Sequence, residues 1–277
     1  MYFTIEIHIN HTHDNTTFIP VLMSKNKHQR RKVLPPTPPP TQSVSASEND
    51  TTNQCTDTVA SATVAPSDTP SASPMRISPQ CGLIVIDHFY TNPMETRDFI
   101  LTQPFTVMGN YPGKRTISYA TEELKQIFQS YVYPFGGKIT EFHIPKPDMS
   151  DAATIYNGAF QYATARDRSW VHLDGFNNWA GVLYLTPDAP LSAGTGFYRY
   201  RDGPLYTKRE MEVAGKKTET DKASQDITKW EKVDTVGNVF NRLILFNAYR
   251  FHMSLDYFGD SKENGRLFQV FFFSTEQ

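Results

Sequence analysis

The residues best suited to chemistry are a histidine and an aspartate two positions apart, His172 and Asp174, in the segment 171–174. On a β-strand, alternate side chains point to the same side, so these two would project together while Val171 and Leu173 face the other way. Their backbone positions would be about 6–7 Å apart, close enough for an imidazole and a carboxylate to share one metal ion. Alone, the pair is a weak signal, because an ordinary polar pair on a strand has the same spacing.

A second histidine and an arginine follow on later strands. His252 lies in the segment 248–258, where it alternates with apolar residues, and Arg266 stands at the head of the apolar run 267–274. A lone histidine or arginine at a strand end is usually structural, and for Arg266 that reading is a salt bridge that caps the last strand. Four such residues, in this order and on strands of the same domain, are harder to explain as unrelated structural residues.

The first 79 residues differ in composition from the rest of the chain. Residues 33–79 contain no aromatic residue and are rich in Ser, Thr and Pro, so they cannot bury enough apolar surface to offset their conformational entropy. We therefore predict that residues 1–79 are disordered and that residues 80–277 form one folded domain. The basic run 25–32 is interpreted as solvated linker, with a nuclear-localisation or phosphate-binding patch as the alternative.

Residues 80–277 are predicted to form a mainly β (α+β) domain with two helices near its start. Helices are predicted at 94–103 and 122–132, the second capped by Thr121. The polar segment 207–230 is interpreted as a weakly helical insertion. Strands are predicted at 82–89, 138–144, 155–164, 170–176, 179–186, 196–201, 236–247, 251–258 and 266–274. This succession predicts an antiparallel barrel or jelly roll with the helices packed outside.

Composition narrows the classes of partner and compartment. The net charge of −2 and the pI near 6.4 argue against a general nucleic-acid or anionic-membrane surface. Two cysteines, Cys55 and Cys81, are too few for a disulfide framework and fit a reducing compartment. No apolar run approaches the roughly 20 residues of a membrane span, and the first residues do not form a secretory signal. We therefore expect a cytoplasmic protein with no membrane partner; its oligomeric state is not predicted.

The motifs resemble the superfamily of 2-oxoglutarate- and iron(II)-dependent oxygenases, in particular its prolyl-hydroxylase-like group. The order His172, Asp174, His252 and Arg266 follows that family's motif, and the segment 84–100 is similar to its entry strand and helix. The likeness covers about residues 84–274 and is nearest to a branch of unknown function. It implies a double-stranded β-helix (jelly-roll) core with N-terminal flanking helices.

The resemblance also implies an activity and a role for each residue. The protein would be a dioxygenase that couples decarboxylation of 2-oxoglutarate to oxidation, most simply hydroxylation, of an unknown substrate. His172, Asp174 and His252 would be the catalytic residues that hold Fe(II) as a facial triad, with 2-oxoglutarate in two of the three open coordination positions and dioxygen in the third. Arg266 would bind the distal carboxylate of this cosubstrate as a bidentate pair. Ascorbate is an optional cofactor of the class.

A second cosubstrate contact is expected on the strand before the triad. Gln161 and Tyr162 have opposite parity there, so only one can face the site; Tyr162 is preferred, with core packing as its alternative. Arg250 is interpreted either as an aid to Arg266 or as the partner of a nearby carboxylate. Three further residues are interpreted as lining a substrate site or, alternatively, packing at its rim: Trp179, Arg199 and Tyr200.

Two rival functions use the same residues. One is a cupin-like jelly-roll binding module that performs no oxidation. The other is a zinc hydrolase with the same two histidines and aspartate. The sequence argues against this function, because no Glu or His lies near enough in sequence to be nominated as the general base. The primary substrate is not predicted.

Overall fold

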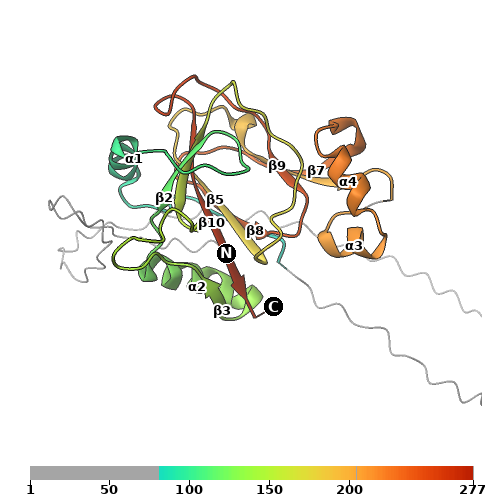
Figure 1. Ribbon diagram of the computed structural model, residues 1–277, viewed down its shortest axis with the longest axis horizontal. Coiled ribbons are helices and arrows are strands. Elements are labelled where there is room, and N and C mark those ends of the chain that lie inside the picture. Colours follow the sequence, from blue (N-terminus) through green and yellow to red (C-terminus); the bar gives the residue numbers. More distant parts are fainter. Residues whose placement is uncertain (1–80, 204, 277) are drawn as a thin grey trace, which may run out of the picture. The chain divides into compact units, whose positions relative to one another are not determined.

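The computed structural model describes residues 81–203 and 205–276, and the predicted disorder of residues 1–79 concerns a segment outside that part of the chain. The described residues form ten β-strands and four α-helices (Figure 1). All strand pairs are antiparallel, so the prediction of a mainly β domain with few helices is confirmed. No helix in this part of the chain combines the length and apolar character that crossing a membrane requires.

Seven strands form the larger sheet. Its strand order is β1-β8-β5-β10-β4-β2, and β3 pairs with the C-terminal part of β10. The strands are β1 (Leu83–Ile86), β2 (Lys114–Ser118), β3 (Ile139–Phe142), β4 (Ala159–Ala163), β5 (Trp179–Tyr184), β8 (Leu243–Asn247) and β10 (Arg266–Thr275).

Three strands form the smaller sheet, in the order β7 (Trp230–Val236), β6 (Thr195–Tyr200), β9 (His252–Ser254). His172 adds a single antiparallel bridge to His252 at its edge. The predicted strand over 170–176 is therefore wrong beyond this one residue. The reason is that Asp174 donates its backbone N–H to the carbonyl of Ala248, outside β9, so the chain leaves the sheet after His172.

From β5 to β10 the chain crosses between the two sheets four times, and only the neighbours β6 and β7 follow one another in the same sheet. Strand β8 shows the consequence, because its apolar run is buried on both faces. Leu243 and Leu245 face the helices, whereas Ile244 and Phe246 pack with Phe197 of the smaller sheet. The space between the two sheets is thus a core of its own, and it is where the polar residues discussed below project.

Two helices cover the outer face of the larger sheet, as predicted. They are α1 (Pro93–Thr102) and α2 (Glu122–Gly136). Thr121 caps α2 by accepting a hydrogen bond from the backbone N–H of Leu124 at 3.3 Å. Phe128 of α2 is fully buried against Phe271 and Phe273 of β10, so α2 holds the larger sheet in place from outside.

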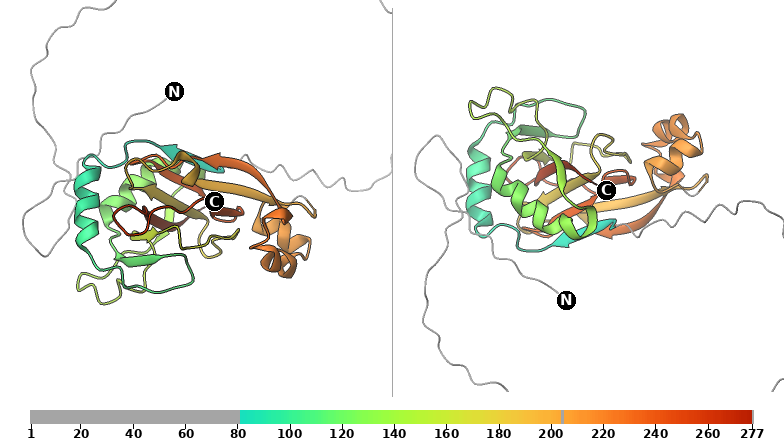
Figure 2. Two further views of the ribbon diagram at one scale, coloured as in Figure 1. Left: turned by 90° about the horizontal axis from the view of Figure 1, so that it is seen from above. Right: turned by 90° about the horizontal axis from the view of Figure 1, so that it is seen from below.

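The predicted insertion is helical, with α3 (Lys208–Val213), opened by a Thr207 capping box, and α4 (Lys217–Ala223). In Figure 2 these helices lie at the opposite end of the strands from α1. The polar stretch that follows forms β7, which was not predicted because only its ends, Trp230 and Val236, are buried. β2 was missed because its sequence is mostly polar and begins with Lys114 and Arg115.

Candidate metal site

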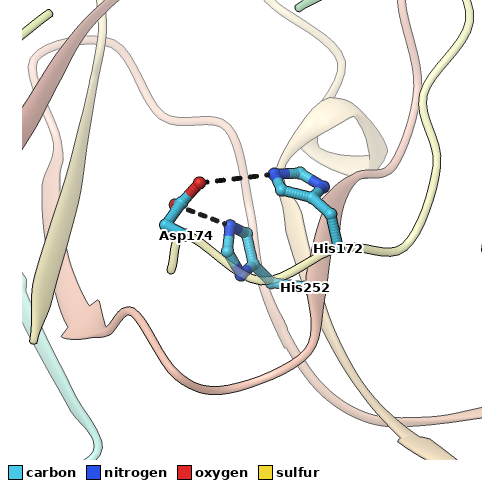
Figure 3. A group of neighbouring side chains, drawn as sticks. All are labelled: His172, Asp174 and His252. Atoms are coloured by element: carbon cyan, nitrogen blue, oxygen red, sulfur yellow. Dashed lines mark ion pairs between the residues drawn. The ribbon is translucent and has the colours of Figure 1, made fainter. Parts of the chain in front are cut away.

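The three predicted ligands come together in the structure. One possible ligand atom from each of His172, Asp174 and His252 lies within 4.8 Å of the others, and this set is called the triad below. The Nε2 atom of His252 is 3.1 Å from Oδ2 of Asp174, and the Nε2 atom of His172 is 3.7 Å from Oδ1. Figure 3 shows the carboxylate facing both imidazoles, with a dashed line from each of its oxygens to one ring. Two nitrogens and a carboxylate directed at one point form a donor set typical of a divalent metal.

Backbone pairing places the two histidines. Each donates its backbone N–H to the carbonyl of the other at 3.0 Å, although they lie on segments far apart in the sequence. Their ring centroids are consequently 4.4 Å apart. Phe246 and Phe197 surround His252, whose side chain is 6% exposed, whereas that of His172 is 38% exposed. The triad therefore has one side inside the protein and one side open to solvent.

The second nitrogen of each ring contacts a backbone carbonyl. Nδ1 of His172 is 2.9 Å from the Trp170 oxygen, and Nδ1 of His252 is 2.8 Å from the Arg250 oxygen. A carbonyl can only accept, so each Nδ1 carries the proton and each Nε2 of a neutral ring directs a lone pair at Asp174. A divalent metal ion between the two lone pairs and the carboxylate would be bound by all three groups. The donor set therefore fits a metal ion, held with the carbonyl support usual for histidine ligands.

The electrostatics favour the ligating forms of these residues. Desolvation, together with the neighbouring His252, lowers the pKa of His172, which keeps this ring neutral to lower pH. Burial alone would raise the pKa of Asp174, but His252, His172 and Arg115 outweigh this effect and lower it. Asp174 is therefore an anion and His172 a neutral donor under ordinary conditions.

Arg266 lies inside the protein, at the start of β10. It is fully buried, and no carboxylate among the described residues pairs with it. Nε donates to the Ala193 carbonyl at 3.0 Å and Nη2 lies 3.5 Å from that of Gly194, while Nη1 has no hydrogen-bond partner. The salt bridge considered as its structural role is thus absent from the described residues. A buried guanidinium with an unused donor fits an anionic ligand.

Strand register relates Arg266 to the triad. Nη2 of Arg266 approaches the carbonyl of Gly194, the residue before Thr195. Thr195 pairs with Ser254 of β9, which lies two residues beyond His252. On the larger sheet, the guanidinium lies 4.4 Å from the ring centroid of Phe268, on the face toward the smaller sheet. Arg266 and His252 thus both project into the space between the sheets.

The structure turns Gln161, rather than Tyr162, to the side on which Arg266 lies. Arg266 pairs with Ala163 and Phe268 with Gln161, so these four side chains share one face and Tyr162 has the other. The Tyr162 ring packs against Phe105, with centroids 5.0 Å apart, in the core under the helices. The expected alternation was correct, but the register of β4 on β10 turns Gln161 inward.

The other candidates have structural partners. Arg250 donates to Asp234 at 2.6 Å, in agreement with its interpretation as the partner of a nearby carboxylate. Arg199 pairs with Glu231. Trp179 is buried, and its indole N–H donates to Thr275.

Sequence reasoning missed Arg115, on β2. It is 5% exposed, and its Nε and Nη2 donate to Oε1 of Gln161 at 2.9 and 2.5 Å. Because it pairs with Gln161 in register, it lies on the same face as Arg266. No pattern in the sequence indicates it, because β2 is a short and mostly polar strand.

Known proteins give one family match and several distant structural likenesses. No curated protein matches the chain. HygX from Streptomyces hygroscopicus, with nickel and 2-oxoglutarate bound, shares 14% identity at a TM-score of 0.36, over 68% of this chain and 81% of that one. A Trichoplax adhaerens prolyl hydroxylase, in complex with a hypoxia inducible factor peptide, shares 13% at 0.38, over 69% and 83%. A Pseudomonas putida prolyl-4-hydroxylase shares 15% at 0.36, over 69% and 91%. TM-scores below 0.5 do not establish a shared fold.

The family match covers most of the chain. A model of the family of unknown function DUF6445 matches residues 69–273, a range that includes the triad and Arg266. The protein belongs to the family of unknown function DUF6445.

Proposed function

We propose that this protein is a non-haem iron(II)- and 2-oxoglutarate-dependent dioxygenase. It would couple decarboxylation of 2-oxoglutarate to the hydroxylation of a second substrate by dioxygen. The observation that carries the proposal is the pairing of a two-histidine, one-carboxylate triad with a buried arginine that has no carboxylate partner among the described residues. A metal site alone would suit several functions, whereas the unused cation calls for an anionic cosubstrate.

His172, Asp174 and His252 would hold the metal. When bound, iron(II) with 2-oxoglutarate supplies the oxidising chemistry that no side chain can provide. Asp174 supplies the only anionic ligand of the set, and the carbonyls of Trp170 and Arg250 fix the ring orientations through Nδ1. The open side at His172 leaves room for ligands other than protein.

Arg266 would hold the distal carboxylate of 2-oxoglutarate. A guanidinium offers two parallel N–H donors to a carboxylate, and burial strengthens the pair because water does not screen it. Phe268 and Tyr184 flank the guanidinium with ring faces and edges, so they limit its orientation. This role favours the oxygenase over a zinc hydrolase, whose chemistry requires no 2-oxoglutarate.

The proposed fold is a double-stranded β-helix. Support comes from the repeated crossing of the chain between two antiparallel sheets from β5 to β10 and from the place of the triad at the edge of the smaller one. We also propose the division into an N-terminal region, residues 1–79, and an oxygenase domain, residues 80–277.

The test is an anaerobic titration of the full chain with iron(II) and then 2-oxoglutarate. An oxygenase of this class should develop a weak visible metal-to-ligand charge-transfer band that saturates with 2-oxoglutarate. Admission of air should then form succinate. If iron(II) binds but no band develops, the protein is a binding module rather than an oxygenase. If zinc binds and 2-oxoglutarate has no effect on the protein, the hydrolase is favoured.

A further inference from the structure

Arg115 is a second buried cation that forms no ion pair with a carboxylate among the described residues. Its guanidinium donates twice to the amide oxygen of Gln161, which is neutral. The amide nitrogen of Gln161 donates in turn to the carbonyl of Pro112 at 2.6 Å, so the amide is held in this orientation. Desolvation lowers the pKa of Arg115 to about 10, since no carboxylate is near enough to restore it fully. A buried charge with only neutral partners costs free energy that an arriving anion would recover.

The position of Arg115 relates it to the triad. A cross-strand row runs over the face toward the smaller sheet, from Arg115 to Gln161, then Phe268, then Tyr184. The guanidinium is also close enough to Asp174 to interact with its carboxylate electrostatically. Arg115 therefore acts on the same space as the triad, from the side of β2.

Aromatic rings surround the guanidinium. It lies 3.7 Å from the ring centroid of Tyr111 and 5.2 Å from that of Tyr156. Tyr156 is 46% exposed. The surroundings of Arg115 thus pass from a buried cation to a half-exposed ring, which would suit a ligand with a carboxylate and an apolar body.

Close packing holds the segment that carries these rings. Gly113 has a φ of +75°, and a Cβ there would lie 1.9 Å from the carbonyl oxygen of Tyr162. Its N–H donates to Asp167 at 3.1 Å. The tyrosine hydroxyl of Tyr111 donates to the Val107 carbonyl at 2.7 Å. Arg115 and Tyr111 are therefore pre-positioned, as a recognition site requires.

The ligand of Arg115 would be a molecule other than 2-oxoglutarate. In the proposed function, one end of the cosubstrate lies on the metal and the other on Arg266, so neither carboxylate is left for a second arginine. With the metal, Asp174, both arginines and the cosubstrate counted, one positive charge remains. A monocarboxylate balances that charge, whereas a phosphate dianion beside Asp174 would exceed it.

We propose that Arg115, oriented by Gln161 and flanked by Tyr111 and Tyr156, binds a carboxylate of the primary substrate. The inference rests on the proposed oxygenase function and names the class of its substrate as a carboxylic acid with an apolar body. Arg115 is then a specificity-determining residue, which places the substrate beside the metal without contacting the metal.

The experiment uses the full chain and a matched pair of probes, 4-fluorobenzoate and its neutral analogue 4-fluorobenzamide. Fluorine NMR follows their binding at millimolar concentrations, first without metal and then with manganese(II) and saturating 2-oxoglutarate. We expect the benzoate to bind in both states and the benzamide to bind at least about tenfold more weakly. Manganese(II) should speed fluorine relaxation of the bound benzoate, because the probe lies near the triad.

The variants separate Arg115 from the cosubstrate. Arg115→Gln should weaken benzoate binding about tenfold or more, and Arg115→Lys should weaken it less, while 2-oxoglutarate affinity stays at the wild-type value. Lys114→Gln, an exposed neighbour, should change neither. Should Arg115→Gln not fold, the wild-type probe pair and the lysine variant still decide the matter.

Three results would overturn the inference. Equal affinity for the benzoate and the benzamide, or no binding of either, would show that there is no carboxylate site. Displacement of the benzoate by 2-oxoglutarate would assign Arg115 to the cosubstrate. If wild type fails to bind manganese or 2-oxoglutarate, that result contradicts the oxygenase function instead. Benzoate binding in the metal-free state would then still report on Arg115.

Discussion

His172 and His252 are joined by two backbone hydrogen bonds, each 3.0 Å long, that run in opposite directions between the same two residues. This closed pair sets the imidazoles side by side through the main chain, with centroids 4.4 Å apart. The positions of the two histidine ligands are therefore set by the pairing of β9 with the segment around His172 rather than by a bound ion. A preformed site of this kind loses little conformational entropy when a metal binds.

Metal binding should depend on Asp174. Asp174→Asn removes the only anionic donor but keeps the shape of the side chain, so iron(II) affinity should fall by at least about a hundredfold. His252→Ala should have a similar effect. Anaerobic titration with iron(II) measures both. Asp256→Asn, an exposed residue a few positions beyond His252, is the matched control and should bind metal normally. Normal affinity in Asp174→Asn would remove this residue from the ligand set.

Cosubstrate binding should depend on Arg266 and not on Tyr162. Arg266→Ala should keep the metal and weaken 2-oxoglutarate binding by about 2–5 kcal/mol, roughly 30- to several-thousand-fold. Arg266→Lys should have an intermediate affinity for 2-oxoglutarate, because it keeps the positive charge but loses the two parallel N–H donors. Tyr162→Phe should bind like wild type, since its ring packs outside against Phe105. The charge-transfer band, titrated with 2-oxoglutarate under nitrogen, reports all three. An unchanged 2-oxoglutarate affinity in Arg266→Ala would refute the assignment of Arg266 to the cosubstrate.

Stability should depend strongly on Phe128. This ring is fully buried, and four aromatic rings surround it: Phe89, Phe142, Phe271 and Phe273. Phe128→Ala should lower the free energy of unfolding by about 3–5 kcal/mol, because it removes apolar contacts and leaves a cavity. Phe135→Ala, on the same helix and 48% exposed in wild type, should cost far less. Urea denaturation of the two variants compares them, and equal losses would mean that α2 does not pack as described.

The ion pair between Asp87 and Arg242 predicts a dependence of stability on pH. Arg242 donates twice to the carboxylate, at 2.6 and 3.0 Å, and this hydrogen bonding lowers the pKa of Asp87 below its ordinary value of 3.8. A lowered carboxyl pKa stabilises the fold above about that pH, and the contribution is lost as the pH falls through the folded-state pKa. Asp87→Asn should therefore cost about 0.5–1 kcal/mol at pH 7, a modest value because the pair is partly exposed.

The same comparison at low pH provides the check. Below the pKa of Asp87 the difference between Asp87→Asn and wild type should vanish in denaturation curves. Asp98→Asn, an exposed carboxylate on α1, is the control at both pH values. A difference that persists in acid would show that the substitution acts through packing rather than through charge.

Local pattern is enough to predict several elements. Thr121 and the apolar spacing after it predict α2, and the long apolar run predicts β10, because caps and periodicity are properties of neighbouring residues. The order of His172, Asp174, His252 and Arg266 along the chain is likewise a property of the amino-acid sequence alone. The mainly β class follows from the number of short strands and is confirmed.

Long-range pairing decided the rest. Alternation showed that Gln161 and Tyr162 face opposite sides, but only the register of β4 on β10 determined that Gln161 faces the triad side. The segment around His172 has a strand's sequence and forms one bridge, because its partner β9 is short. Arg115 had no signal of its own: its burial, its bond to Gln161 and its effect on Asp174 arise from contacts between segments far apart in sequence. Residue type and spacing determine which groups could do chemistry, whereas the pairing of distant strands determines which of them meet.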